Sequence, residues 1–250
     1  MLMARMQQEQ TLSYLTQATI NVGVVIPTLN EEKNIGEVLS KLKSLGYNNI
    51  LVIDGNSKDG TIEVATTNGA KVISQTGKGK GAAIRQVLNN NYLNVDALVF
   101  MDADGSMAPE EIPAFVEALN SGADVVKGSR FLKGGRTHDM TALRRFGNKV
   151  MMFIVNFLCS AKYTDLCYGY MAFNRHAIAS LSPILESENF EIETEILIKA
   201  LNLNLVVTEV PSIEYERKNG TSNLNTFKDG FKIFRTIFRE SINPIQTSKT

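Results

Sequence analysis

Two aspartates stand directly after an apolar run, with one residue between them. Residues 97–101 read as a buried strand, and Asp102-Ala103-Asp104 follows it. In an extended backbone, residues i and i+2 face the same side, so both carboxylates can reach one hard cation. A magnesium or manganese ion there would bridge the phosphates of a nucleoside diphosphate and neutralise the leaving group. The alternative is a solvated turn ahead of the helix that starts at Pro109.

The same two carboxylates raise the alternative of a glycoside hydrolase. Hydrolases place one carboxyl group on each side of the scissile bond and raise the pKa of one of them. Neighbouring carboxylates that project the same way suit a metal ion better, so a hydrolase is disfavoured.

Polar residues also follow three earlier predicted strands. The segments are residues 27–32, residues 54–57 and the basic loop Gly77–Gly81. Ligands of open parallel sheets bind outside the carboxyl ends of the strands, so we expect all three to share one crevice with the aspartates. Asp54 stands where nucleotide folds often place an acidic residue that reads base or ribose; a turn aspartate is the alternative. Lys78 lies in a loop that suits phosphate without matching a Walker sequence, and a flexible basic turn is the alternative.

The elements that must position these residues alternate between β-branched runs and helical patterns. Strands are predicted at 20–27, 50–53, 71–74, 97–101 and 124–127, with helices at 31–44, from 57–61 onward, at 79–88 and at 109–119. After a loop at 128–140, helices are predicted at 143–158, 191–201 and 225–240 and strands at 170–173 and 205–210. This order predicts an α/β fold with a mostly parallel central sheet flanked by helices.

Composition narrows the class of protein. A chain of 250 residues with 44% hydrophobic residues suits one globular domain. Because 26 basic residues balance 26 acidic ones, we expect no nucleic acid partner. The spacing of Cys159 and Cys167 matches neither a zinc site nor a disulfide framework and predicts free thiols in a reducing compartment.

The ends of the chain carry no recognisable targeting segment. The first twenty residues lack the apolar core of a signal peptide, and no apolar run is long enough for a transmembrane helix. We therefore expect a cytoplasmic protein, divided into an N-terminal extension (1–19), a catalytic domain (20–240) and a C-terminal tail (241–250). The sequence does not indicate an oligomeric state.

Three segments resemble the successive signatures of family 2 glycosyltransferases. They are Val24–Glu32, Asp54–Thr61 and Met101–Asp104, within a resemblance that extends over about residues 21 to 240. The chain is similar in particular to the branch that contains polyprenyl- and dolichol-phosphate sugar synthases. The resemblance implies a GT-A fold with a Rossmann-like nucleotide half and an acceptor half. It also implies a UDP- or GDP-linked sugar donor and a divalent cation, Mg²⁺ or Mn²⁺.

The resemblance also implies roles for individual residues of the first half. Base and ribose would be held by Pro27, Asn30, Glu32 and Asp54, and metal and pyrophosphate by Asp102 and Asp104. Ala103 between them would contact the nucleotide sugar. Two departures leave details open. Residues 54–57 read Asp-Gly-Asn-Ser where Asp-Asp-x-Ser is commoner, and Gly105 follows Asp104 where the synthases often have a larger polar residue. The exact nucleotide contact and a third metal ligand are therefore unassigned.

Three arginine positions of the second half resemble phosphate-binding positions of the family. Arg130 resembles the arginine of a mobile loop that meets the donor phosphate, and Arg144 or Arg145 the basic pair that meets an acceptor phosphate. Of these, Arg130 and Arg145 are the predicted catalytic residues. Arg217 resembles the arginine of a late Arg-x-x-Gly-x-Ser segment that closes over phosphates. A planar guanidinium suits a bidentate grip on phosphate oxygens. The alternative for the first two positions is a solvated cation near a helix start.

The acceptor decides whether a general base is needed. A phosphate acceptor is already anionic, whereas a hydroxyl acceptor needs a base. Asp165 begins a segment that looks like the family's Asp-x-x-Ser-Gly-aromatic turn, and Glu191, Glu193 and Glu195 look like its helix beside the active site. Asp165 or one of these glutamates is the candidate base.

The last predicted helix bears on a membrane contact. Phe227, Phe231, Phe234 and Phe238 recur on one helical face, with basic residues on its flank. Such a helix (residues 225–240) can lie at a membrane interface, or it can pack on the domain core. Many synthases of this branch continue into transmembrane helices, which the chain up to Thr250 lacks, so a soluble acceptor stays an alternative.

The sequence thus predicts a metal-dependent, inverting transfer of a hexose from a UDP- or GDP-sugar to a polyprenyl-phosphate acceptor. Transfer to a soluble small molecule or a glycan hydroxyl is the second hypothesis. A nucleotidyltransferase is disfavoured because the segment after the first strand is acidic rather than glycine-rich and basic. Intact acidic signatures also disfavour a noncatalytic nucleotide-sugar-binding module.

Overall fold

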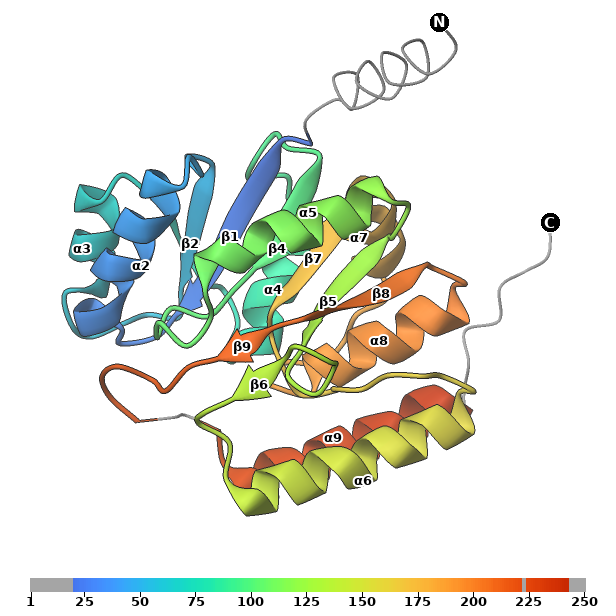
Figure 1. The fold of residues 1–250 in the computed structure, drawn as a ribbon. Helices are drawn as coiled ribbons and strands as arrows, with labels where there is room; N and C mark the ends of the chain where they lie inside the picture. The colour runs from blue at the N-terminus through green and yellow to red at the C-terminus, as the bar shows by residue number, and fades with distance from the viewer. Residues whose placement is uncertain (1–19, 222–223, 243–250) are drawn as a thin grey trace, which may run out of the picture.

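The computed structural model describes residues 20–221 and 224–242 of the chain (Figure 1). The predicted extension at 1–19 and residues 243–250 of the predicted tail lie outside the described residues. The last helix continues to Ile242, past the predicted domain end at residue 240.

A seven-stranded sheet forms the centre of the fold. Its order is β3 (Lys71–Ser74), β2 (Ile50–Asp54), β1 (Val22–Thr28), β4 (Ala97–Phe100), β7 (Met171–Asn174), β5 (Val125–Ser129) and β8 (Val207–Pro211). Neighbours are parallel except where β7 pairs with β4 and β5. The predicted α/β fold with a mostly parallel sheet is confirmed. The strand ends that carry the predicted donor site belong to the parallel half.

Helices cover both faces of this sheet. One face carries α2 (Glu32–Ser44), α3 (Thr61–Thr67) and α5 (Ile112–Asn120), and the other carries α4 (Lys80–Leu88), α7 (Arg175–Leu181) and α8 (Ile192–Asn202). Side chains of a strand alternate between the faces, so Val24 and Ile26 join the first core and Val25 joins the second. Burial on both faces explains why the central strands are apolar throughout.

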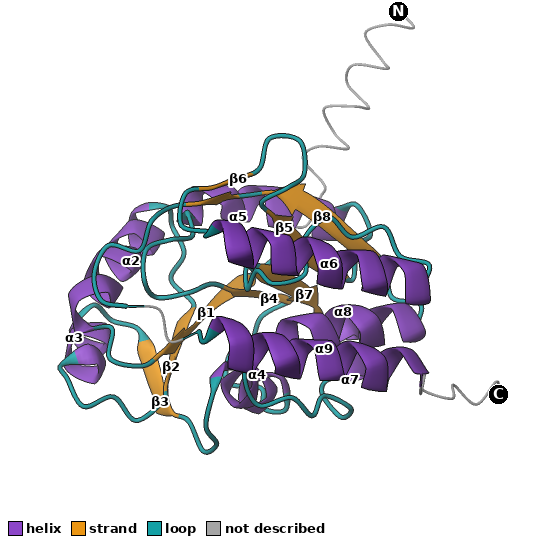
Figure 2. Ribbon diagram, turned by 90° about the horizontal axis from the view of Figure 1, so that it is seen from below, coloured by secondary structure: helices purple, strands orange, loops and turns teal. Residues whose placement is uncertain are grey.

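Two long helices lie side by side below the sheet (Figures 1 and 2). They are α6 (Ala142–Leu158) and α9 (Thr226–Ile242), and α9 also packs against α8. Ile233 and Ile237 of α9 and Val155 of α6 are buried in the adjoining core. None of the helices in the described part of the chain combines the length and the hydrophobicity that crossing a membrane requires.

Three short elements differ from the prediction. The segment predicted as a loop at 128–140 contains β6 (Arg136–Thr137), which pairs with β9 (Ile213–Glu214) from far along the chain. The helix predicted at 109–119 is divided into η1 (Pro109–Glu111) and α5. Helix α7 was not predicted, although Asn174 caps it by accepting a hydrogen bond from the Ala177 amide at 2.8 Å.

Candidate active site

A cavity of about 1060 Å³ opens beside the carboxyl ends of β1, β2, β3 and β4. Its opposite wall comes from α6 and α9. Of the predicted site residues, seven line it: Pro27, Lys78, Asp102, Ala103, Asp104, Arg130 and Arg217. Five others do not: Asn30, Glu32, Asp54, Asp165 and Arg145. The structure therefore brings the two aspartates together with cations from three distant segments.

Each of the two aspartates has a basic partner in the chain. Nζ of Lys80 lies 2.6 Å from Oδ1 of Asp102, and a guanidinium nitrogen of Arg217 lies 3.0 Å from Oδ2 of Asp104. The other oxygen of Asp104 accepts a hydrogen bond from the Ser106 amide at 3.0 Å. Burial raises the pKa of Asp102 above its ordinary value, although the charge of Lys80 acts in the opposite direction.

Lys80 joins three elements at the floor of the cavity. Its Nζ also donates to Oε1 of Glu193 at 3.0 Å, so it bridges the end of β4 and the start of α8. Burial by itself lowers the pKa of Lys80, but the charges of Asp102 and Glu193 raise it above the ordinary value. A Cβ atom on Gly169 would lie 2.1 Å from this ammonium, so the glycine leaves the room that it occupies.

The sequence argument selected Lys78 rather than Lys80 from the same basic loop. Lys78 is exposed at the cavity rim, whereas Lys80 points inward from the first turn of α4. Gly79 between them has a φ of 90°, a conformation that suits glycine and turns the chain into the helix. The alternation Gly-Lys-Gly-Lys-Gly was the available signal, but it did not reveal which lysine faces the carboxylates.

Asp54 organises the neighbouring loops from a buried position. Its carboxylate accepts hydrogen bonds from the hydroxyls of Thr28 and Ser57 at 3.2 and 2.6 Å and from the Ser57 amide at 2.9 Å. Thr28 lines the cavity and Asp54 does not. In this structure the carboxylate therefore orients the β1 and β2 strand ends, and direct contact with a base remains a prediction.

Asn30 and Glu32 lie on the exposed outer side of the same strand ends. Oδ1 of Asn30 accepts from the Lys58 amide at 2.8 Å, and the Glu32 amide donates to Asp59 at 3.2 Å. Asn30 has a φ of 56°, which asparagine tolerates better than most residues. Their contacts connect two loops, and the structure does not bring either side chain to the cavity.

Arg130 and Asp165 form a buried pair behind the cavity wall. Two guanidinium nitrogens of Arg130 lie 2.7 and 2.9 Å from the two oxygens of Asp165, and a third lies 2.9 Å from Glu214. Burial raises the pKa of Asp165, but Arg130 outweighs it and the net pKa lies below the ordinary value. Asn148 of α6 also donates to Asp165. Asp165 is fully buried and ion-paired and does not line the cavity, so its role as a general base remains a prediction that this geometry does not favour.

Of the two arginines at the start of α6, one lines the cavity and the other faces solvent. Arg144 lines the cavity and donates to Thr226 and to the Leu224 carbonyl at 3.3 and 3.2 Å. Arg145, the predicted catalytic residue of the two, is exposed, and its guanidinium lies 5.7 Å from the centre of the Phe131 ring. Of the two alternatives, Arg144 has the position that a phosphate in the cavity would require.

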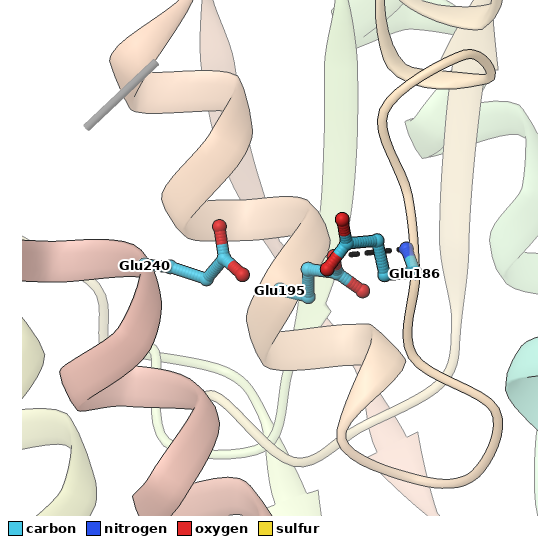
Figure 3. A group of neighbouring side chains, drawn as sticks. All are labelled: Glu186, Glu195 and Glu240. Atoms are coloured by element: carbon cyan, nitrogen blue, oxygen red, sulfur yellow. Dashed lines mark hydrogen bonds between the residues drawn. The ribbon is translucent and has the colours of Figure 1, made fainter. Parts of the chain in front are cut away.

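One other group of carboxylates in the described residues is compact enough to resemble a metal site. Figure 3 shows Glu186, Glu195 and Glu240 together, with the Glu186 amide donating to Glu195. Lys199 lies 2.7 Å from Glu195, and Arg239 lies 2.6 Å from Glu240. Because both cations bridge carboxylates of the two helices, the group acts as a clamp between α8 and α9.

The comparison with protein families decides the class of this site. The model described as glycosyl transferase family 2 matches residues 23–181. The chain belongs to this family. It is therefore a glycosyltransferase, and the nucleotidyltransferase and binding-module alternatives are set aside.

Relatives of this family 2 glycosyltransferase include enzymes of lipid-linked sugar synthesis. It is 34% identical over 221 residues to glycosyltransferase AglJ of Haloferax volcanii, covering 88% of this chain and 72% of AglJ. It is 31% identical over 223 residues to polyprenol monophosphomannose synthase of Mycolicibacterium smegmatis, covering 84% and 82% of the two chains. The dolichol-phosphate mannosyltransferase of Pyrococcus furiosus is 34% identical over 233 residues, covering 88% and 63%.

Solved structures support the GT-A fold of the family 2 domain. Glucosyl-3-phosphoglycerate synthase from Mycobacterium tuberculosis, in complex with Mn²⁺, UDP and glucosyl-3-phosphoglycerate, superposes with a TM-score of 0.72 at 21% identity. The match covers 92% of this chain and 83% of the synthase. The same synthase has been crystallised with Mg²⁺ and UDP. The predicted divalent cation is consistent with these neighbours.

Proposed function

We propose that this glycosyltransferase moves a hexose from a UDP- or GDP-sugar to a polyprenyl phosphate, with inversion at the sugar carbon. Five of the relatives carry names that refer to dolichyl, dolichol, polyprenol or undecaprenyl phosphate. The family and the predicted signatures support the donor class, and the relatives' acceptors support the lipid phosphate.

The carboxylates of Asp102 and Asp104 fit a divalent cation. Both line the cavity, keep part of their side-chain surface exposed and offer the hard oxygen donors that Mg²⁺ and Mn²⁺ prefer. Within residues 20–221 and 224–242, no third acidic, histidine or cysteine side chain joins them in a three-residue group. When bound, the cation would neutralise charge on the departing nucleoside diphosphate. Lys80 and Arg217 supply further positive charge beside the same two residues.

The acceptor half of the cavity suits a phosphate attached to an apolar chain. Arg144, Lys228 and Lys232 contribute positive groups, and Leu143, Met151, Phe227 and Phe231 contribute apolar surface to the same wall. The phosphate oxygen would attack the sugar carbon directly, so no strong base is required. The buried position of Asp165 is compatible with such an acceptor; for a hydroxyl acceptor, Glu193 is the predicted candidate base that lines the cavity, where it pairs with Lys80.

Helices α6 and α9 together supply an apolar surface for membrane contact. On α6 the exposed residues recur along one face at Leu143, Phe146, Val150, Phe153 and Phe157, and on α9 at Phe227, Phe231, Phe234, Phe238 and Ile242. Phe157 and Phe227 are 76% and 78% exposed, while Ile233 and Ile237 of α9 are buried. The two alternatives predicted for α9, contact with a membrane and packing on the domain core, therefore apply to two different faces of one helix. We propose a peripheral contact with a membrane surface, and the cytoplasmic location remains a prediction.

The observation that carries this proposal is the continuity of one cavity from Asp102 and Asp104 to the apolar residues of α6 and α9. The test is transfer from radiolabelled UDP- and GDP-hexoses, with Mn²⁺ or Mg²⁺, to a polyprenyl phosphate in detergent or liposomes. A lipid-linked product with inverted configuration is expected. Turnover confined to water-soluble acceptors would overturn the lipid acceptor and leave the glycosyltransferase class intact.

A soluble phosphorylated acceptor is the second candidate. The fold neighbour from Mycobacterium tuberculosis has been crystallised with phosphoglyceric acid, which presents a phosphate without a lipid. Including 3-phosphoglycerate beside polyprenyl phosphate in the same assay separates the two candidates.

A further inference from the structure

The guanidinium of Arg217 pairs with the Asp104 carboxylate, which is also a proposed ligand of the divalent cation. Its guanidinium lies 3.0 Å from Oδ2 of Asp104 and 2.9 Å from Oε1 of Glu31. The side chain is only 18% exposed, although the residues on either side of it are exposed. In this structure Asp104 thus has a cation of its own chain as its ion-pair partner.

The segment that carries Arg217 is held across the site by contacts before and after this residue. The Tyr215 amide donates to the Ser106 carbonyl at 2.8 Å, next to the Asp102–Asp104 turn. Beyond Arg217, Lys218 pairs with Glu37, and Nδ2 of Asn219 donates to Oδ1 of Asn34 at 2.9 Å. The Lys218–Glu37 pair is at the surface, so it contributes little and can be exchanged. The other two contacts reach the buried residues Ser106 and Asn34.

The two cations of the site differ in how firmly they are held. Lys80 is buried between Asp102 and Glu193 and starts a helix that packs against the rest of the domain. Arg217 belongs to an exposed loop, and Glu31 keeps a hydrogen bond from Asn34 at 2.6 Å if the arginine leaves. Moving Arg217 leaves the buried Glu31 carboxylate with a neutral hydrogen bond from Asn34, whereas moving Lys80 would take the cation from both Asp102 and the buried Glu193.

A guanidinium and a divalent cation compete for the same oxygen of Asp104. Two positive charges at that separation repel each other, so each weakens the binding of the other to Asp104. A bound diphosphate favours the divalent cation at Asp104, because the diphosphate oxygens offer the guanidinium of Arg217 an alternative bidentate partner.

We propose that Arg217 is an internal competitor of the divalent cation. It holds Asp104 while the site is empty, and it leaves when a nucleoside diphosphate draws it away. Free cation then binds weakly to the empty enzyme, and cation and nucleotide bind together. The inference rests on the proposed function, because it takes Asp104 as the cation ligand.

The test measures Mn²⁺ binding to the nucleotide-free protein, by titration calorimetry or by the electron paramagnetic resonance signal of free Mn²⁺. Arg217→Met should bind Mn²⁺ about two- to fivefold more tightly than the unmodified protein, the size expected for losing one partly exposed competing ion pair. Asn219→Ala, which loosens the segment and keeps the guanidinium, should change affinity in the same direction by a smaller factor. Arg217→Met should also bind UDP or GDP less tightly when Mn²⁺ is present.

Two controls make the outcomes distinct. Arg175→Met removes the same charge from an exposed pair with Asp96 and should leave Mn²⁺ affinity unchanged. Asp104→Ala should abolish the binding. If Arg217→Met binds Mn²⁺ no more tightly while Asp104→Ala loses it, competition by Arg217 is wrong and the proposed metal site stands. If Asp104→Ala binds Mn²⁺ as well as the unmodified protein, the metal site and the competition both fail.

Discussion

Arg130 and Asp165 make a bidentate ion pair inside the protein, with Nε and Oδ2 separated by 2.7 Å. Their side chains are 4% and 0% exposed. A pair this deeply buried stabilises the loop connections around the acceptor half only while both partners are present.

Replacing Asp165 by Ala should destabilise the fold, because it leaves the buried Arg130 charge without its main partner. The expected loss is about 3 to 5 kcal/mol in the free energy of unfolding. Urea denaturation of both proteins measures it. Asp165→Asn, which keeps the shape, should lose less stability and retain transfer in its folded fraction. Abolished transfer by a fully stable Asp165→Asn protein would support the predicted general-base role.

The same pair predicts a pH dependence of stability. Because the folded pKa of Asp165 lies below its ordinary value of 3.8, its contribution is fully present above that value. It is lost as the pH falls through the lowered folded pKa. Unfolding free energies of the unmodified protein should therefore fall more steeply at acid pH than those of Asp165→Asn. Parallel curves would contradict the assignment.

Asp104→Ala should abolish metal-stimulated transfer without unfolding the protein. Losing a cation ligand at the leaving group removes several kcal/mol of transition-state stabilisation, so we expect a fall in kcat of at least about a hundredfold. Initial rates across a Mn²⁺ titration measure it, and circular dichroism checks the fold. Undiminished metal-stimulated turnover would refute the assignment of Asp104.

Gly169→Ala tests Lys80 without changing the lysine. The new Cβ would lie 2.1 Å from Nζ of Lys80 and 2.7 Å from Oε1 of Glu193, so the ammonium must move. Since only the end of a flexible side chain is displaced, the protein should fold while kcat falls by about tenfold or more, as expected for a misplaced charged group. Gly147→Ala is the matched control, because its Cβ would meet no atom within 4 Å. Equal kcat values for the two variants would exclude a role for the Lys80 position.

Replacing Phe153, Phe157 and Phe231 together by Ser should weaken binding to liposomes that contain anionic phospholipid. Each exposes most of its surface, so the change removes apolar contact with the membrane and costs the fold little. Sedimentation with vesicles measures the partition. Ile62→Ser, an exposed position on α3, is the control. Unchanged partition of the triple variant would rule out this membrane surface.

Lys199→Met should destabilise the clamp between α8 and α9. Lys199 lies 2.7 Å from the fully buried Glu195, which retains Arg239 at 3.4 Å, so the expected loss is about 2 to 3 kcal/mol. Thermal unfolding of Lys199→Met measures this loss of stability, and Lys33→Met, at an exposed lysine, is the control. Stabilisation of Lys199→Met by added Mg²⁺ above that of the unmodified protein would indicate a metal site there instead.

The order of strands and helices was predictable from the residues because each element carries its own period of apolar positions. The long elements agree with the structure to within a few residues, for example at 71–74 and in helix α6. Helix α7 is short, and β6 forms only because β9 reaches it from a distant part of the chain. The local sequence pattern therefore gives little indication of either helix α7 or the pairing of β6 with β9.

The sequence by itself determined the family, the parallel half of the sheet and the position of Asp102 and Asp104 at a strand end. It did so because motif spacing and apolar periodicity are local properties. Only the tertiary structure decided which charged residues meet. Lys80 rather than Lys78 reaches the aspartates, Arg144 rather than Arg145 faces the cavity, and Asp165 is enclosed by Arg130. These outcomes depend on contacts between segments distant along the chain, and a side chain's direction there is set by the packing around it.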